Sequence, residues 1–263
     1  MQNWTGCSSM NIGDTVTLKD SRDGTKYLVG KLKKSSSDSG TTGGWCWMLD
    51  NLALDLSDSA VKANLTSTTT NAPDTNLTNL KNNVVAKTAN GGSWTDTYTV
   101  PYIATGGFGS VGRWTKDTVA PTKYGSGSGK LGVYYNYCAA SAGTYCYSSY
   151  SSSDVTADVC PAGWRLPTGG QVNTSVTPNQ GEFQTLYDTY GNYNNNFSIA
   201  LSTPLSGNFY SDYAGYLGRN GNWWSSTLSY STYMYNLRID GSGVDPKNYN
   251  GRDYGYSIRC ILK

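Results

Sequence analysis

The first third of the chain predicts a β-hairpin, a loop and a further apolar segment. Residues 14–20 alternate apolar and polar side chains, as expected for a half-buried strand. Residues 21–24 contain Asp-Gly, a strong hairpin signal, and residues 26–32 supply the return strand. The composition of residues 33–44 predicts a flexible loop, after which residues 46–52 restore an apolar segment.

Helical spacing is clearest in residues 181–190. The apolar side chains at i, i+3, i+4 and i+7 share one face: Phe183, Leu186, Tyr187 and Tyr190. Gly191 supplies a C-terminal stop, and Glu182 at the start is expected to compensate the helix dipole. Shorter helical possibilities occur at Asp58–Asn64 and Asp74–Asn82.

The last third of the chain is strand-like. Residues 233–240 alternate, so that Tyr233, Tyr235, Leu237 and Ile239 share one face and Met234, Asn236, Arg238 and Asp240 share the other. Residues 133–137 and 256–262 are further strand candidates. The elements together predict a single α+β domain over residues 1–263, with two short helices, antiparallel sheets and much irregular structure.

The six cysteines indicate whether the protein resides in an oxidising or a reducing compartment. No two of them have the CxxC spacing of zinc ribbons or thioredoxin-like sites. An even number in a chain rich in Ser, Thr, Asn and Tyr predicts disulfides, and therefore an extracellular or cell-surface location. We expect the pairs Cys7–Cys46, Cys138–Cys146 and Cys160–Cys260, with six buried free thiols as the alternative.

Composition narrows the chemistry further. The chain has 263 residues and no histidine, which excludes Ser-His-Asp and Cys-His catalysis and histidine-based zinc sites. A net charge of +2, with only 14% charged residues, does not supply the excess of basic residues that binding to nucleic acid requires. No apolar run reaches the roughly 18 residues of a membrane span. Because Met1–Trp4 is polar, we expect that a leader or anchor has been removed.

Several sequence blocks carry a resemblance to a known family. They are Asp20–Gly24 (DSRDG), CWM and DNL within Cys46–Leu52, Cys160–Thr168 (CPAGWRLPT), Gly181–Phe183 (GEF), Trp224–Thr227 (WSST) and Tyr254–Cys260 (YGYSIRC). In this order they resemble the Fibrobacter succinogenes major paralogous domain over about residues 11–263, with long insertions at 33–44 and 57–130. The resemblance implies a C-type lectin-like fold. That fold is similar to the formylglycine-generating type of domain and to the variable proteins of diversity-generating retroelements.

The resemblance also implies a surface-displayed, non-catalytic recognition protein. In the retroelement systems the C-terminal segment is diversified at adenines, which yields Asn, Tyr, Ser, Asp and Gly on a ligand-binding face. The corresponding segment here is residues 205–256, which interleave tyrosine with small polar residues like an antibody paratope. Because residues 134–153 are equally rich in Tyr and Ser, compositional drift of a polar secreted protein is the alternative explanation.

The predicted binding face combines tyrosine anchors with polar side chains that set specificity. Its members are Tyr210, Asp212, Tyr213, Tyr216, Asn220, Asn222, Tyr230, Tyr233, Lys247, Asn248, Tyr249, Asn250, Arg252, Asp253 and Tyr254. The expected partner is a protein or glycan on another cell surface. No cofactor and no metal are predicted.

Other activities are weaker interpretations of the sequence. The main alternative is a fixed-sequence carbohydrate-binding or adhesive module of the bacterial cell surface. A formylglycine-generating enzyme would need a catalytic cysteine pair, whereas all six cysteines have plausible structural partners. Calcium-dependent lectins use Glu-Pro-Asn or Gln-Pro-Asp, but Asp245–Lys247 ends in a cation that would repel calcium. Trp164 and Trp224 are expected in the core, and Trp223 is the better candidate for exposure.

Overall fold

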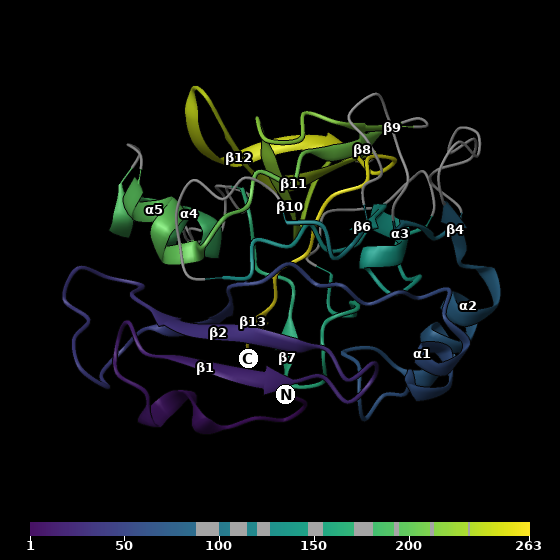
Figure 1. The fold of residues 1–263 in the computed structure, drawn as a ribbon, viewed down its shortest axis with the longest axis horizontal. Helices are drawn as coiled ribbons and strands as arrows, with labels where there is room; N and C mark the ends of the chain where they lie inside the picture. The colour runs from purple at the N-terminus through teal and green to yellow at the C-terminus, as the bar shows by residue number, and fades with distance from the viewer. Residues whose placement is uncertain are drawn as a thin grey trace.

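The fold is mixed α+β, as predicted, and has two tiers of β-structure. The computed structural model describes residues 1–87, 100–105, 115–119, 127–146, 155–170, 181–191, 195–210, 213–230 and 232–263. One tier lies above the other, with helices at both sides (Figure 1). The lower tier contains both ends of the chain, and the upper tier contains most of the segment predicted to bind a ligand.

The lower tier is a five-stranded sheet in the order β1-β2-β3-β13-β7. Its strands are β1 (Thr15–Lys19), β2 (Lys26–Leu32), β3 (Trp45–Met48), β13 (Ile261–Leu262) and β7 (Trp164–Arg165). β1 and β2 form the predicted antiparallel hairpin. The last strand lies between β3 and β7, so this sheet joins the first and last segments of the fold. Of the predicted strand 256–262, only its last part belongs to this sheet.

Both chain ends are also attached to the turn before β7. The backbone N–H of Asn3 donates to the carbonyl of Ala162 at 2.8 Å. The N–H of Lys263 donates to the carbonyl of Gly163 at 3.0 Å. This turn belongs to the CPAGWRLPT block, which therefore anchors the two termini.

Three disulfides have the predicted pairing. Cys7–Cys46 ties the N-terminal segment to β3, and Cys160–Cys260 joins the segments that precede β7 and β13. Cys138–Cys146 closes the short loop. No cysteine is free, so the alternative of six thiols is wrong. The three crosslinks are consistent with an oxidising compartment.

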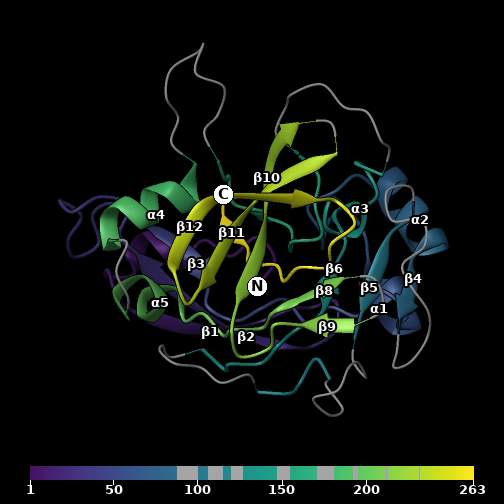
Figure 2. The ribbon, with the colours of Figure 1, turned by 90° about the horizontal axis from the view of Figure 1, so that it is seen from above.

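The upper tier consists of a three-stranded antiparallel sheet and a small hairpin. The sheet has the order β10 (Gly221–Tyr230), β11 (Tyr233–Asp240), β12 (Gly243–Gly251). Beside it lies the pair β8 (Asn208–Tyr210) and β9 (Tyr213–Gly215) (Figure 2). β10 is buried on both faces over most of its length, which removes the alternation that identifies β11 in the sequence.

A third sheet contains β4 (Val85–Lys87), β5 (Tyr102–Ala104) and β6 (Tyr134–Tyr135). β4 and β5 are parallel, unlike the antiparallel pairing expected throughout. The predicted strand 133–137 is cut short because Asn136 caps a helix. The Oδ1 atom of Asn136 accepts a hydrogen bond from Ala139 N at 2.9 Å.

The described residues contain five α-helices, more than the two short helices of the predicted fold and the three helical patterns in the sequence. They are α1 (Ser59–Asn64), α2 (Asp74–Asn83), α3 (Tyr137–Ala140), α4 (Glu182–Tyr190) and α5 (Asn195–Leu201). α1, α2 and α4 coincide with the helical patterns, whereas α3 is a single turn and is too short to show a period. None of the five is long and apolar enough to cross a membrane.

Glu182 lies in the first turn of α4, as predicted, and has a further role. Its carboxylate accepts hydrogen bonds from Arg165 Nη1 and from the backbone N–H of Thr168, both at 2.8 Å. The hydroxyl of Thr168 in turn accepts from Glu182 N at 2.9 Å. The start of α4 is therefore fixed to β7 and to the loop that follows it.

The core fills the space between the tiers. Trp164 and Trp224 are fully buried there, as predicted. Trp223 is also fully buried, so the expectation that it is exposed was wrong. Its indole Nε1 donates to Asn51 Oδ1 at 2.8 Å, and the Arg259 guanidinium lies over its ring. Both partners are remote in sequence, so the local pattern could not reveal this burial.

Candidate functional site

Exposed aromatic side chains gather in the upper tier. Among the described residues, the exposed large apolar and aromatic side chains are Val85, Val119, Ile199, Tyr210, Tyr216, Tyr230, Tyr233 and Tyr249. All five aromatic members are tyrosines within the predicted segment 205–256. Aromatic residues are enriched at binding surfaces, so this tier is the candidate functional site.

Four tyrosines of the three-stranded sheet form what we call the tyrosine cluster: Tyr230, Tyr233, Tyr235 and Tyr249. The rings of Tyr230 and Tyr233 have centroids 4.7 Å apart. The ring of Tyr249 stands edge-on to the other three, at 5.8, 6.0 and 6.4 Å. Edge-to-face packing is a favourable arrangement for aromatic rings. Tyr230 and Tyr249 nevertheless keep about half of their surface exposed, at 51% and 48%.

Strand register brings the cluster together. Tyr230 lies opposite Tyr233 across the β10–β11 hairpin, and Tyr235 lies opposite Tyr249 across β11 and β12. Residues opposite each other in antiparallel strands share a face, so the four rings come to one side of the sheet. Gly170 packs beneath them, because a Cβ atom there would lie 2.4 Å from the Tyr235 ring.

The tyrosine cluster is electrically neutral. Desolvation, followed by the proximity of the Tyr249 and Tyr233 hydroxyls, raises the pKa of Tyr230 above its usual value. Its phenol therefore stays protonated at neutral pH and serves as a hydrogen-bond donor and acceptor. Rings and hydroxyls together can bury an apolar surface while bonding to polar groups around it.

A second group, which we call the tyrosine pair, consists of Tyr210 and Tyr254. Their rings are stacked, with centroids 4.4 Å apart and planes inclined by 20°. Tyr254 contacts Tyr256 at 5.7 Å, and Tyr256 contacts the buried Trp224 at 4.4 Å. This series of rings runs from the core to the surface.

The tyrosine cluster and the tyrosine pair belong to opposite faces of the upper sheet. Tyr235 and Asn236 are neighbours on β11, so they point to opposite sides. The cluster lies on the Tyr235 side. Trp224 lies opposite Asn236 and contacts the ring series of the pair. The fifteen predicted residues therefore do not all project from one face of this sheet.

The other predicted binding residues vary in exposure. Tyr216 is exposed, whereas the half-buried ones are Asn220, Lys247, Asn248, Asn250 and Asp253. Asn222 and Arg252 are buried, so their side chains belong to the scaffold, and Asn222 Nδ2 donates to the carbonyl of Gly207 at 3.2 Å. Asp212 and the side chain of Tyr213 lie outside the described residues.

The predicted binding face omitted Tyr235. The signal was present, since the alternation in residues 233–240 already places Tyr235 on the face of Tyr233. What the sequence did not show was the position of Tyr249 opposite Tyr235, because that depends on the β11–β12 register. A register shift between Asn236 and Arg238 makes this pairing hard to derive from spacing alone.

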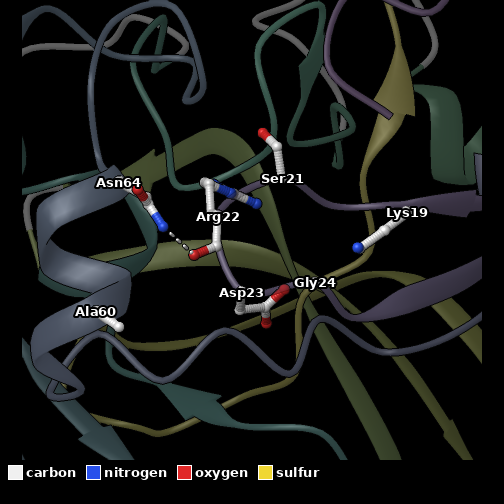
Figure 3. A pocket seen from close by; sticks show the side chains of 7 residues that line it. All are labelled: Lys19, Ser21, Arg22, Asp23, Gly24, Ala60 and Asn64. Atoms are coloured by element: carbon white, nitrogen blue, oxygen red, sulfur yellow. Dashed lines mark hydrogen bonds between the residues drawn. The ribbon is translucent and has the colours of Figure 1, made fainter.

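A hollow elsewhere on the molecule is a weaker candidate. It has a volume of about 530 Å³ and lies between the β1–β2 turn and α1, with Lys19, Asp23 and Asn64 around it (Figure 3). Two of the polar side chains around it are used in the turn. Asp23 accepts hydrogen bonds from Thr25, and Asn64 Nδ2 donates to the carbonyl of Arg22 at 3.0 Å. Lys19 is a further charged side chain around the hollow.

Among the described residues, no group of three or more acidic or cysteine side chains is arranged to hold a metal ion. Asp245 in the DPK sequence accepts a hydrogen bond from the backbone N–H of Lys247 at 3.0 Å. The buried Asp158 carboxylate accepts hydrogen bonds from Cys160 N, Leu166 N and Asn71 Nδ2.

Comparison of the chain with protein-family models, with curated proteins and with solved structures finds no match in any of the three. The function must therefore be inferred from the geometry of the upper tier and from the sequence blocks described above.

Proposed function

We propose that the protein is a non-catalytic ligand-binding protein of the cell surface or extracellular space, with a C-type lectin-like fold. Its ligand, a protein or glycan of another cell, binds to the tyrosine-rich upper tier. The observation that carries the proposal is that every exposed large aromatic side chain among the described residues lies within residues 205–256. We further propose that this segment is diversified by a retroelement.

The packing of the sequence blocks supports the proposal. Arg22 of DSRDG forms a fully buried ion pair with Asp20 at 2.7 Å and donates to the carbonyl of Val159 at 2.6 Å. Trp224 of WSST donates to the carbonyl of Tyr135 at 2.8 Å. Cys160 and Cys260 join two further blocks. The blocks that carry the family resemblance thus make a scaffold, and the tyrosine-rich stretches between them supply surface.

The chemistry of the exposed residues fits adaptable recognition. Tyrosine offers a large, rigid contact area with few rotatable bonds, and half-buried polar side chains such as that of Lys247 can bond to polar groups of many ligands. Replacement of one such residue by Asn, Ser or Tyr at an exposed strand position changes the contact surface without altering the core. This separation of scaffold and surface is what a diversified receptor requires.

Loss of the tyrosine cluster should abolish binding. We expect a Tyr230→Ser/Tyr233→Ser/Tyr249→Ser variant to lose binding of the labelled protein to intact bacterial cells and to a glycan array. The matched control is Ile199→Ser, which changes an exposed side chain on α5. Equal binding by both variants, with both folded by circular dichroism, would contradict the proposal.

Neutrality of the cluster also favours the second candidate, a fixed-sequence carbohydrate-binding module, because uncharged rings and hydroxyls suit a neutral sugar. Gene copies from related strains distinguish the two. Differences confined to adenine-derived codons at Tyr210, Tyr230, Tyr233 and Tyr249, beside a reverse transcriptase gene and a template repeat, would establish diversification. Invariant codons there, together with glycan-array binding, would favour the fixed module.

A further inference from the structure

The tyrosine pair has a geometry that the binding proposal does not use. Tyr210 and Tyr254 are separated by more than forty residues in sequence, yet their rings stack at 4.4 Å with planes 20° apart. This is the shortest and most nearly parallel of the tyrosine–tyrosine contacts among the described residues; Tyr230–Tyr233, the next shortest, lies at 4.7 Å and 32°.

The backbone holds these two rings in register. Phe209 N donates to the carbonyl of Gly255 at 2.8 Å, and Gly255 N donates to the carbonyl of Phe209 at 2.7 Å. This antiparallel bridge places Tyr210 and Tyr254 directly opposite each other, in the non-hydrogen-bonded position where side chains are closest. The Tyr254 ring also contacts the Tyr256 ring, with centroids 5.7 Å apart, while Tyr210 is 41% exposed.

We propose that Tyr210 and Tyr254 are a site of oxidative modification, at which a one-electron oxidant converts the pair into an intramolecular dityrosine. The oxidant belongs to the class of peroxidases acting with hydrogen peroxide, which an extracellular protein with three disulfides can meet. Exposure of Tyr210 gives the oxidant access, and stacking supplies the second ring. This inference concerns the chain with tyrosine at position 210 and does not depend on which ligand the upper tier binds.

The coupling removes two hydrogen atoms from the tyrosine pair. Each phenol loses its O–H hydrogen, as one electron and one proton, to give a phenoxyl radical. The two radicals join by a carbon–carbon bond between the positions ortho to oxygen, and the ortho hydrogens move to the oxygens to restore both phenols. Hydrogen peroxide accepts the two electrons and two protons and becomes two molecules of water.

The crosslink would have a structural consequence. It would join β8 to the segment after β12 and enclose β9, β10, β11 and β12 within one covalent loop. A crosslink stabilises mainly by restricting the unfolded chain, so the oxidised protein should resist denaturant better than the untreated protein. The lower tier already has disulfides, whereas both of these rings are in the upper tier.

The test uses the full chain, diluted to suppress contact between molecules, with peroxidase and hydrogen peroxide. We expect dityrosine fluorescence, a monomeric band on a denaturing gel and an intact mass lower by two hydrogens. Proteolytic mapping should give a linked peptide pair containing Tyr210 and Tyr254 as the main intramolecular product. A map that links Tyr230 to Tyr233 instead, or a product that is only intermolecular, would overturn the assignment.

Conservative variants complete the experiment. Tyr210→Phe keeps the ring but removes the phenol, so it should lose most of the intramolecular dityrosine while its melting temperature stays near that of the wild type. Tyr216→Phe is the matched control, because Tyr216 is 57% exposed and has no ring contact among the described residues. An undiminished yield in Tyr210→Phe would refute the proposal, and the peptide map of the wild type decides the question if that variant misfolds.

Discussion

Asp158 is a carboxyl whose charge is at odds with its surroundings. It is fully buried, and burial raises the pKa of its carboxyl to about 6, against 3.8 for a free group. Hydrogen bonds from Leu166 N, Asn71 Nδ2 and Cys160 N offset part of that effect. These contacts position the CPAGWRLPT block, to which both chain ends are hydrogen-bonded. The buried Asp158 carboxyl therefore has a structural role despite the energetic cost of its charge.

This buried carboxyl predicts an unusual pH dependence of stability. Because the folded pKa is raised, the stabilising contribution is fully present below pH 3.8 and is lost as the pH rises through about 6. A shift of this size corresponds to about 3 kcal/mol of unfolding free energy between those limits. We expect the stability of Asp158→Asn relative to wild type to improve by that order between pH 4 and pH 7.

Urea unfolding of the two proteins at a series of pH values measures this difference. Any hydrogen bond lost in Asp158→Asn adds a constant offset, whereas the titration changes with pH. Carboxyls with lowered pKa values, such as Asp20 beside Arg22, occur in both proteins and cancel in the difference. A pH-independent difference would show that Asp158 is charged in the folded protein at an ordinary pKa.

At the scale of elements, the loop after β7 packs against strand β11 at Gly170, which lies close to the Tyr235 ring. Its φ of +71° is a conformation that favours glycine, and a Cβ atom would meet the Tyr235 ring at 2.4 Å. Gly170→Ala should therefore incur backbone strain of about 1–2 kcal/mol and overpacking of about 1–3 kcal/mol. We also expect displacement of Tyr235 to disturb the tyrosine cluster and weaken ligand binding.

Gly40→Ala separates these two effects. Gly40 also has a positive φ, +54°, but nothing lies within 4 Å of the position that a Cβ atom would take, so only backbone strain is expected there. Urea midpoints of the two variants, compared with wild type, give the overpacking contribution by difference. Equal losses would mean that the Tyr235 ring moves aside freely and that the cluster does not depend on Gly170.

Elements with a local period were predictable from the sequence, and those made by distant contacts were not. The β1–β2 hairpin, α4 and β11 each carry a repeating apolar pattern, and all three are present. β7 has only two residues and is a strand because it pairs with β13, which is itself the end of the predicted strand 256–262. Likewise, the enrichment of tyrosine pointed to the upper tier, but the division into two faces depends on strand register.

At the scale of the whole molecule, one segment connects the scaffold to the binding surface. After Tyr254 the chain passes Tyr256, whose ring contacts Trp224, and Ser257, whose carbonyl accepts from Trp224 N at 3.2 Å. It then reaches Cys260 and enters the lower sheet as β13. The two tiers share this segment, so they should unfold together rather than independently.

Removal of the Cys160–Cys260 disulfide should therefore destabilise both tiers at once. It spans 100 residues, and the chain-entropy model assigns such a loop about 4–5 kcal/mol, against about 2–3 kcal/mol for the 8-residue span of Cys138–Cys146. We expect Cys160→Ala/Cys260→Ala to lose more unfolding free energy than the control Cys138→Ala/Cys146→Ala. Far-ultraviolet dichroism and tyrosine fluorescence should follow one transition. Two separate transitions, or a larger loss in the control, would show that the upper tier is held independently of the lower sheet.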